Sequence, residues 1–279
     1  MENNHIETLM SFLNVPLDCS DTVFDRFAAL PGAVIGVGDK PLERYVYIPG
    51  KRNDRVVLVS HIDTIWDKAY TRSFSGEREV KFTDGVFSSS IPECGIGADD
   101  RAGCAMLWEL RECGHSILIV DGEEHGKIGA RYLKKSNPRL FRELNRHKYI
   151  IELDWAGTDS CLYNQVDNTK RFKKHIEKSI GFVDAKASGG TDLQILCRNI
   201  CGVNLGIGYH GQHTKDESLV LSEWENTCNK LNEFLAEPQH RFRSYILPPY
   251  IRFAKLCINK LLRILKIKKD TVSSKGNTK

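Results

Sequence analysis

Short apolar runs of strand length alternate with runs of helical character along most of this chain. The strand-like runs are rich in β-branched residues and too short for helices; they read YVYIP, VVLVS, SILIV, YIIELD and NLGIGY. Helical character is found in the first 30 residues and in residues 100–113, 127–135, 191–199 and 217–237. The alternation predicts an α/β fold, a three-layer α/β/α sandwich in which helices cover both faces of a mixed, largely parallel sheet.

One stretch outside this alternation is typical of a β-hairpin. Residues 78–90 (REVKFTDGVFSSS) place Asp84 and Gly85 between residues that favour strands. An Asp-Gly pair favours the two-residue turns that join antiparallel strands. We therefore expect a hairpin excursion in residues 78–90.

Charge divides the chain into an acidic body and a basic tail. Residues 240–279 contain 11 Lys or Arg and one Asp, a net charge of +10, so the remainder carries −6 of the total of +4. We expect a globular domain over residues 1–239, and a basic amphipathic helix with a flexible tail over residues 240–279. The helix, residues 251–269, is suited to an anionic membrane surface or an acidic partner, or to docking on the body. No aromatic-interleaved basic platform accompanies it, so we expect no nucleic acid partner.

The cysteines and the N-terminal sequence favour a cytoplasmic protein. Nine cysteines are scattered singly with no CxxC pair, which is typical of reduced thiols rather than of a disulfide framework or a zinc knuckle. The start, MENNHIETLMSFL, does not have the basic and then apolar pattern of a secretory signal, and no run of eighteen apolar residues predicts a membrane span. We expect a cytoplasmic location, with peripheral membrane attachment left open by the basic tail.

Histidine or acidic residues directly follow, or end, four of the five apolar runs. They are His61 and Asp63, residues 121–124, Asp154, and His210 with His213. Ligands of open α/β sheets bind outside the carboxyl ends of the strands, and acids brought together there repel unless a cation offsets their charge. Imidazole and carboxylate ligands without cysteine suit zinc, with cobalt or manganese as alternatives.

Six short motifs carry a resemblance to a known family. HIDT, GADDRAG, DGEEHGKIGA, a later Asp, SGGTD and HTKDE occur in this order over roughly residues 55–235. In order and character they resemble the motifs of the co-catalytic dinuclear zinc exopeptidases, metallopeptidase clan MH, and most of all peptidase T and its relatives. The resemblance implies a hydrolase domain over residues 1–239, with two zinc ions per chain, that cleaves an amide or peptide bond in a small peptide or an acyl-amino acid by a metal-activated water.

The resemblance also implies a role for individual residues. His61 and Asp154 resemble ligands of one zinc ion, Glu124 and His213 resemble ligands of the other, and Asp99 resembles the carboxylate that bridges both.

Two further residues resemble groups that act in the reaction or support it. Glu123 is similar to the general base, and Asp63 to the acid that orients the ring of the histidine ligand. The peptide bond between Asp99 and Asp100 is often cis in this family.

Several assignments keep an alternative when the residues alone are considered. Glu152 and Asp159 compete with Asp154, and His210 competes with His213. Asp100 is best explained as a cap or turn support for the helix that follows, since Asp is a favoured N-cap residue.

The chain departs from peptidase T in one region. Only residues 155–188 separate Asp154 from SGGTD, too few for the inserted lid domain of peptidase T-like enzymes, and Ser188 stands where those enzymes usually have arginine. The favoured function is an aminopeptidase-like exopeptidase. The alternatives are an N-acyl amino acid deacylase of the same fold and a non-catalytic protein tethered by its basic tail; the oligomeric state is left open.

Overall fold

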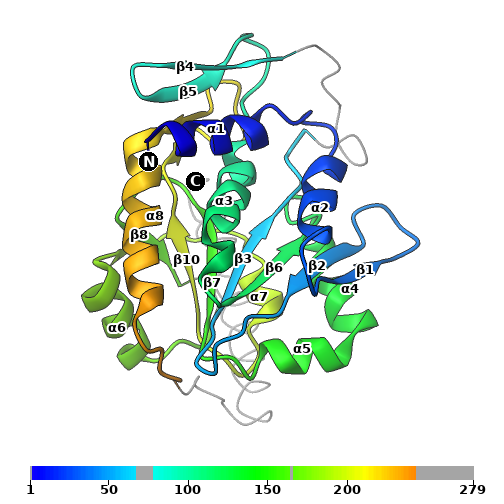
Figure 1. The fold of residues 1–279 in the computed structure, drawn as a ribbon, viewed down its shortest axis with the longest axis vertical. Helices are drawn as coiled ribbons and strands as arrows, with labels where there is room; N and C mark the ends of the chain where they lie inside the picture. Colours follow the sequence, from blue (N-terminus) through cyan, green and yellow to red (C-terminus); the bar gives the residue numbers. More distant parts are fainter. Residues whose placement is uncertain (1, 67–77, 164–165, 243–279) are drawn as a thin grey trace, which may run out of the picture. The chain divides into compact units, whose positions relative to one another are not determined.

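An eight-stranded mixed sheet forms the centre of the described chain, in the order β1-β2-β6-β3-β7-β10-β8-β9 (Figure 1). Strands β6, β3, β7 and β10 pair in parallel, whereas β1, β2 and β8 pair antiparallel with their neighbours toward the centre of the sheet. Their bounds are β1 (Val34–Val37), β2 (Arg44–Ile48), β3 (Val57–His61), β6 (Ser116–Val120), β7 (Ile150–Trp155), β8 (Ser160–Leu162), β9 (Val183–Asp184) and β10 (Gly202–Gly206).

This computed structural model describes residues 2–66, 78–163 and 166–242. The helix expected in residues 251–269 lies outside the described residues. None of the helices within these ranges is long and apolar enough to span a membrane.

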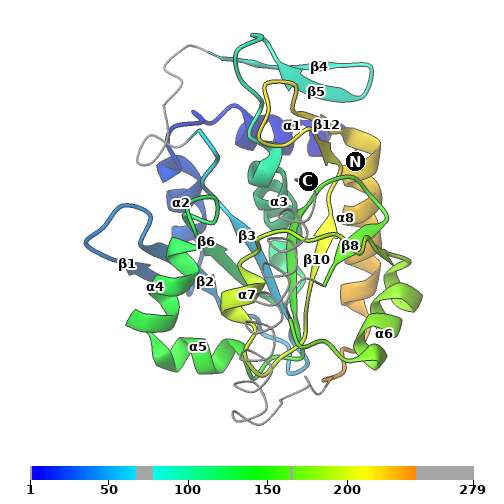
Figure 2. The same ribbon diagram turned by 180° about the vertical axis from the view of Figure 1, so that it is seen from behind.

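Helices cover both faces of the large sheet (Figures 1 and 2). One layer contains α1 (Glu2–Leu13), α2 (Asp21–Ala28), α3 (Ala98–Glu109), α6 (Lys170–Ile180) and α8 (Leu221–Ala236), with a short 3-10 helix at Leu110–Glu112. The other contains α4 (Ile128–Ser136), α5 (Pro138–Leu144) and α7 (Leu193–Leu196). The predicted α/β/α sandwich is therefore confirmed. Every residue of β3, β6 and β10 is buried, which explains why these strands appear in the sequence as continuous apolar runs.

A second, four-stranded sheet has the order β11-β12-β5-β4 and contains the predicted hairpin. Strands β4 (Val80–Thr83) and β5 (Val86–Ser89) pair antiparallel. Asp84 and Gly85 join them with φ angles of 51° and 80°, as a type I′ turn requires. The sheet is completed by β12 (Ser218–Val220) and β11 (Tyr209–His210).

The structure corrects two predicted helices. Residues 218–220 form β12 because Leu219 pairs with Phe87 of the hairpin, so α8 begins only at Leu221. In residues 191–199 only the four residues of α7 are helical. The sequence reading also missed α5, which begins at Pro138 behind the N-cap Asn137, and α6, which the side chain of Thr169 caps.

Candidate metal centre

The residues expected at the strand ends meet beside the carboxyl ends of β3 and β7. The Nε2 atom of His61, the last residue of β3, lies 3.1 Å from Asp99 Oδ1 and 3.5 Å from Asp154 Oδ1 of β7. His213 Nε2 lies 3.1 Å from Asp99 Oδ2 and 2.6 Å from Glu124 Oε1. The Asp99 carboxylate therefore lies between two histidines, each of which has a further carboxylate beside it.

This donor set fits divalent zinc. It offers two imidazole nitrogens and three carboxylates with no cysteine, the ligand types of hydrolytic zinc sites. Ligand atoms of His61, Asp99 and Glu124 lie within 4.8 Å of one another, as do those of His61, Asp100 and Asp154. Asp100 is already engaged, because its two carboxylate oxygens accept the backbone N–H groups of His61 and Gly103, both at 3.1 Å. Its expected role as a cap or turn support agrees with these bonds.

Burial makes the charges at this centre strongly interdependent. His61 is 1 % exposed and Asp154 8 %. Burial and the neighbouring Asp99 carboxylate raise the pKa of Asp154 well above its usual range. Burial alone would lower the pKa of His61, but hydrogen bonds and charge from Asp154 and Asp63 outweigh it and raise that pKa well above 6.5. A bound cation would remove the need for protons to neutralise these acids.

Asp63 connects the two halves of the centre. Its Oδ1 atom lies 3.2 Å from Nδ1 of His61 and accepts the backbone N–H of Glu123 at 3.0 Å, while Oδ2 accepts that of Glu124 at 3.2 Å. A ring that donates through Nδ1 directs its Nε2 lone pair toward a metal. Asp63 thus faces His61 as the resemblance implied, and it also fixes the turn that carries the glutamate pair.

Glu123 has a cationic partner that the sequence reading overlooked. Lys127 Nζ, four residues later in the turn before α4, lies 3.1 Å from Glu123 Oε1. Glu123 is 8 % exposed, and burial together with the Glu124 charge raises its pKa. A Cβ atom on Gly190, in SGGTD, would lie 2.7 Å from Lys127 Nζ. Glycine at position 190 therefore lets the SGGTD loop approach this ion pair.

The loop that carries Asp99 is held by Glu217. The carboxylate of Glu217 accepts the backbone N–H of Gly97 at 2.7 Å and that of Asp99 at 3.0 Å. Burial raises the pKa of Glu217 to about 7. The peptide bond between Asp99 and Asp100 is cis, as the resemblance implied. The motif HTKDE thus contributes both His213 and, four residues later, the side chain that positions Asp99.

The competing residues have other hydrogen-bond or ion-pair partners. Glu152 accepts the backbone N–H of Asp192 at 3.0 Å. Asp159 pairs with Lys230, and His210 pairs with Glu223 at 2.7 Å. These contacts leave Asp154 and His213, rather than their alternatives, beside Asp99. The sequence reading also missed Tyr209, whose hydroxyl donates to Asp154 Oδ1 at 3.3 Å.

This fold and this cluster of histidines and carboxylates define the class of the protein as the co-catalytic metal exopeptidases, as the sequence motifs indicated. The sequence matches peptidase family M28 over residues 45–188, just over half of the chain. The chain therefore belongs to peptidase family M28. A search of curated proteins finds no match.

Solved structures with the same fold have low sequence identity to this chain. The aminopeptidase PepT from Bacillus cereus is 16 % identical with a TM-score of 0.63, and the match covers 85 % of this chain and 98 % of that one. A tripeptidase from Staphylococcus aureus is 14 % identical, with a TM-score of 0.61 and coverage of 85 % and 98 %. An aminopeptidase from the archaeon Desulfurococcus kamchatkensis is 12 % identical, with a TM-score of 0.57 and coverage of 84 % and 95 %.

The region of the peptidase T lid contains only small elements here. Between Asp154 and Gly189 the described chain forms β8, α6 and β9, which extend the large sheet and pack against its face. No inserted domain is present in residues 155–163 and 166–188. The side chain of His213 is 46 % exposed, so one side of the centre is open to solvent.

Proposed function

We propose that the protein is an aminopeptidase-like exopeptidase that uses two zinc ions to hydrolyse small peptides. The observation that supports this proposal most directly is the position of the Asp99 carboxylate, within 3.1 Å of both His61 and His213. Membership of peptidase family M28 supports the reaction class. Structural neighbours named as an aminopeptidase and a tripeptidase support a small peptide substrate.

The donor atoms would divide between two ions. His61 and Asp154 would hold one, Glu124 and His213 the other, and Asp99 both. Zinc bound there supplies a Lewis acid for the scissile carbonyl and lowers the pKa of bound water toward ~7.

Glu123 would move the protons of the reaction. As general base its carboxylate takes a proton from water and then donates it to the leaving amine. Burial and the Glu124 charge raise its pKa, which brings it closer to the neutral range where such a base works best. Lys127 holds the Glu123 carboxylate through Oε1, and Asp63 holds its backbone.

The substitution Glu123→Gln tests the proposal. We expect bound zinc, measured by elemental analysis of the purified chain, to stay at the wild-type level because Glu123 is not assigned as a ligand. Turnover should fall by about 10²- to 10⁴-fold, the usual effect of losing a general base. Glu233→Gln, at an exposed position of α8, is the matched control.

The substrate class is decided by a panel measured on the same zinc-loaded protein. It should contain aminoacyl anilides, dipeptides, tripeptides and N-acyl amino acids. Turnover of substrates with a free amino terminus supports the aminopeptidase, whereas turnover confined to N-acyl amino acids would replace it with a deacylase. Hydrolysis by Glu123→Gln at the wild-type rate would contradict the assigned mechanism.

A further inference from the structure

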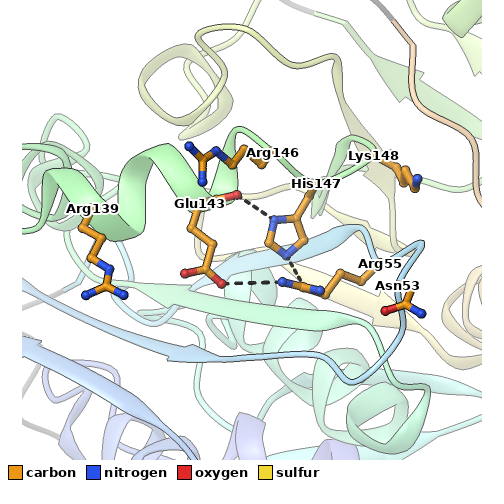
Figure 3. A pocket seen from close by; sticks show the side chains of 7 residues that line it. All are labelled: Asn53, Arg55, Arg139, Glu143, Arg146, His147 and Lys148. Carbon is orange, nitrogen blue, oxygen red and sulfur yellow. Dashed lines mark hydrogen bonds and ion pairs between the residues drawn. The ribbon is translucent and has the colours of Figure 1, made fainter.

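A pocket of about 360 Å³ lies near the amino ends of β3 and β7. Figure 3 shows it from close by. Its lining residues are Asn53, Arg55, Arg139, Glu143, Arg146, His147 and Lys148. Arg55 precedes β3 by two residues and Lys148 precedes β7 by two, whereas His61 and Asp154 lie toward the opposite ends of these strands. Six residues of extended chain separate Arg55 from His61, roughly 20 Å. The pocket is therefore separate from the metal centre.

The lining is strongly cationic although the body of the chain is acidic. Four of the seven residues are Arg or Lys and one is Glu, so the pocket has a net charge of +3 when His147 is neutral. Among the described residues, the one ion pair within the lining joins Arg55 to Glu143 at 3.7 Å. Within the described ranges, Arg139, Arg146 and Lys148 have no carboxylate within ion-pair distance. An anion entering this pocket would meet unneutralised positive charge.

Arg55 is held in place by a buried histidine. His147 is 4 % exposed, and its Nδ1–H donates to the Glu143 carbonyl oxygen at 3.0 Å. Nε2 is then an acceptor and receives the Arg55 Nε–H at 3.1 Å, as Figure 3 shows. Burial lowers the pKa of His147 to about 4, so the ring is neutral at pH 7 and adds no repulsion. A guanidinium fixed in this way loses little freedom when it binds a ligand.

Helix α5 directs further charges to the same pocket. Arg139 and Glu143 lie four residues apart, on one face of the helix. Arg146 follows in the turn after α5. Arg142, on the same helix, is exposed and does not line the pocket. Arg139 and Arg146 therefore contribute their charge to the pocket lining, whereas Arg142 does not.

A further described cation, Arg241, lies beside the pocket. The Arg241 guanidinium donates to the carbonyl oxygens of Arg146 and Asn145, at 2.9 and 3.0 Å. Arg241 is thus a further positive charge beside the lining residue Arg146.

We propose that this pocket binds a phosphate group of a ligand other than the peptide substrate. Arginine forks pair with phosphate oxygens through two parallel hydrogen bonds, and several cations around one dianion favour phosphate over a single carboxylate. The phosphate belongs either to a soluble molecule or to the headgroup of an anionic lipid. The two sources present the same chemistry to the pocket. The proposal does not depend on the catalytic function.

Titration of the full-length, zinc-loaded chain with inorganic pyrophosphate, followed by calorimetry, tests the site itself. The double substitution Arg139→Gln with Arg146→Gln removes two exposed pocket cations, and Arg142→Gln is the matched control on the same helix. We expect wild type and Arg142→Gln to bind saturably, and the double variant to bind at least about tenfold more weakly, as loss of charge-assisted bonds predicts. Equal melting temperatures would show that all three chains are folded.

Sedimentation with vesicles distinguishes the two sources. One set contains phosphatidylcholine alone and the other also contains phosphatidylinositol 4-phosphate. A lipid headgroup is indicated if the wild type binds the second set, pyrophosphate displaces it, and the double variant does not bind. A soluble ligand is indicated if the wild type binds pyrophosphate but does not bind these vesicles. The proposal is overturned if neither pyrophosphate nor vesicles bind saturably, or if the double variant binds as well as Arg142→Gln. If the double variant binds as well as Arg142→Gln, the binding is due to other basic residues.

Discussion

At the scale of single residues, Asp63 has the most connections within the candidate centre, so its substitution gives a sharp test. Asp63→Asn keeps the shape but replaces one acceptor oxygen with a donating NH₂ group. It can no longer accept the backbone N–H groups of both Glu123 and Glu124 while facing His61. Because a group that orients a metal-bound histidine typically contributes 10- to 100-fold, we expect zinc affinity to fall by about that factor.

The measurement for Asp63→Asn is a competition titration of zinc against a coloured chelator. Asp39→Asn, at an exposed position, should bind zinc like the wild type. Unchanged zinc affinity in Asp63→Asn would show that the residue does not orient His61.

His147 lies away from the metal centre, and its low pKa predicts that the free energy of unfolding depends on pH. Its pKa in the folded chain is about 4, against 6.5 for an exposed histidine. Below pH 6.5 the unfolded chain takes up a proton that the folded chain does not accept until about pH 4. The free energy of unfolding therefore falls as the pH is lowered through this window, by roughly 3 kcal/mol in full.

Urea unfolding at several pH values, for wild type and His147→Gln, isolates this contribution. The variant is less stable at pH 7 because it loses the bonds to Arg55 and Ser116, but its stability should decrease less between pH 7 and pH 5. Parallel pH curves for the two proteins would contradict the prediction.

The sequence predicted that the residues of the centre lie together, because each of them lies at a strand end or in one of the six motifs. Their roles as ligands and base stay predictions. Lys127 and Glu217 are part of the six motifs, but the sequence did not predict their contacts. The pairing of Lys127 with Glu123 depends on the turn before α4, and that of Glu217 with the Asp99 loop depends on chain brought together from 118 residues away.

At the scale of elements, buried strands were the easiest to predict and short surface elements the hardest. β3 and β6 are buried along their whole length and appear as unbroken apolar runs. β12 has only three residues, and its pairing with β5 overrides the helical pattern that continues into α8. Sequence periodicity contains no information about such a tertiary partner.

The hairpin between β4 and β5 offers a prediction at this scale. Gly85 has φ +80°, and a Cβ atom added there would meet nothing within 4 Å. The cost of Gly85→Ala is therefore conformational rather than steric, and we expect about 1 kcal/mol of lost stability. Asp84→Asn is the matched control, since Asn tolerates the φ of 51° at that position.

Chemical denaturation monitored by tryptophan fluorescence measures both hairpin variants. Asp84→Asn should unfold within error of the wild type. A Gly85→Ala chain as stable as the wild type would show that the turn is free to adopt another conformation.

At the scale of the whole molecule, opposite charges gather at opposite ends of the sheet. The carboxyl ends of β3 and β7 collect buried acids, and the amino ends of the same strands collect the cations of the phosphate pocket proposed above. Each group of like charges destabilises the chain unless counter-charge binds to it. Both ends of the sheet are therefore expected to gain stability from a ligand, a cation at one end and an anion at the other.

Removal of metal is the prediction that follows for the acidic end. A cation that binds the folded chain alone stabilises it by about 2.7 kcal/mol at a hundred times its dissociation constant. For a chain of this size that gain corresponds to roughly 5 to 10 °C in melting temperature. We therefore expect EDTA to lower the melting temperature by this amount and zinc, but not magnesium, to restore it, because imidazole ligands do not suit magnesium. His213 is a proposed ligand with an exposed side chain and makes no core contact, so the variant His213→Ala should show a smaller zinc-dependent shift. A wild-type melting temperature that changes with neither EDTA nor zinc would exclude a metal at this centre.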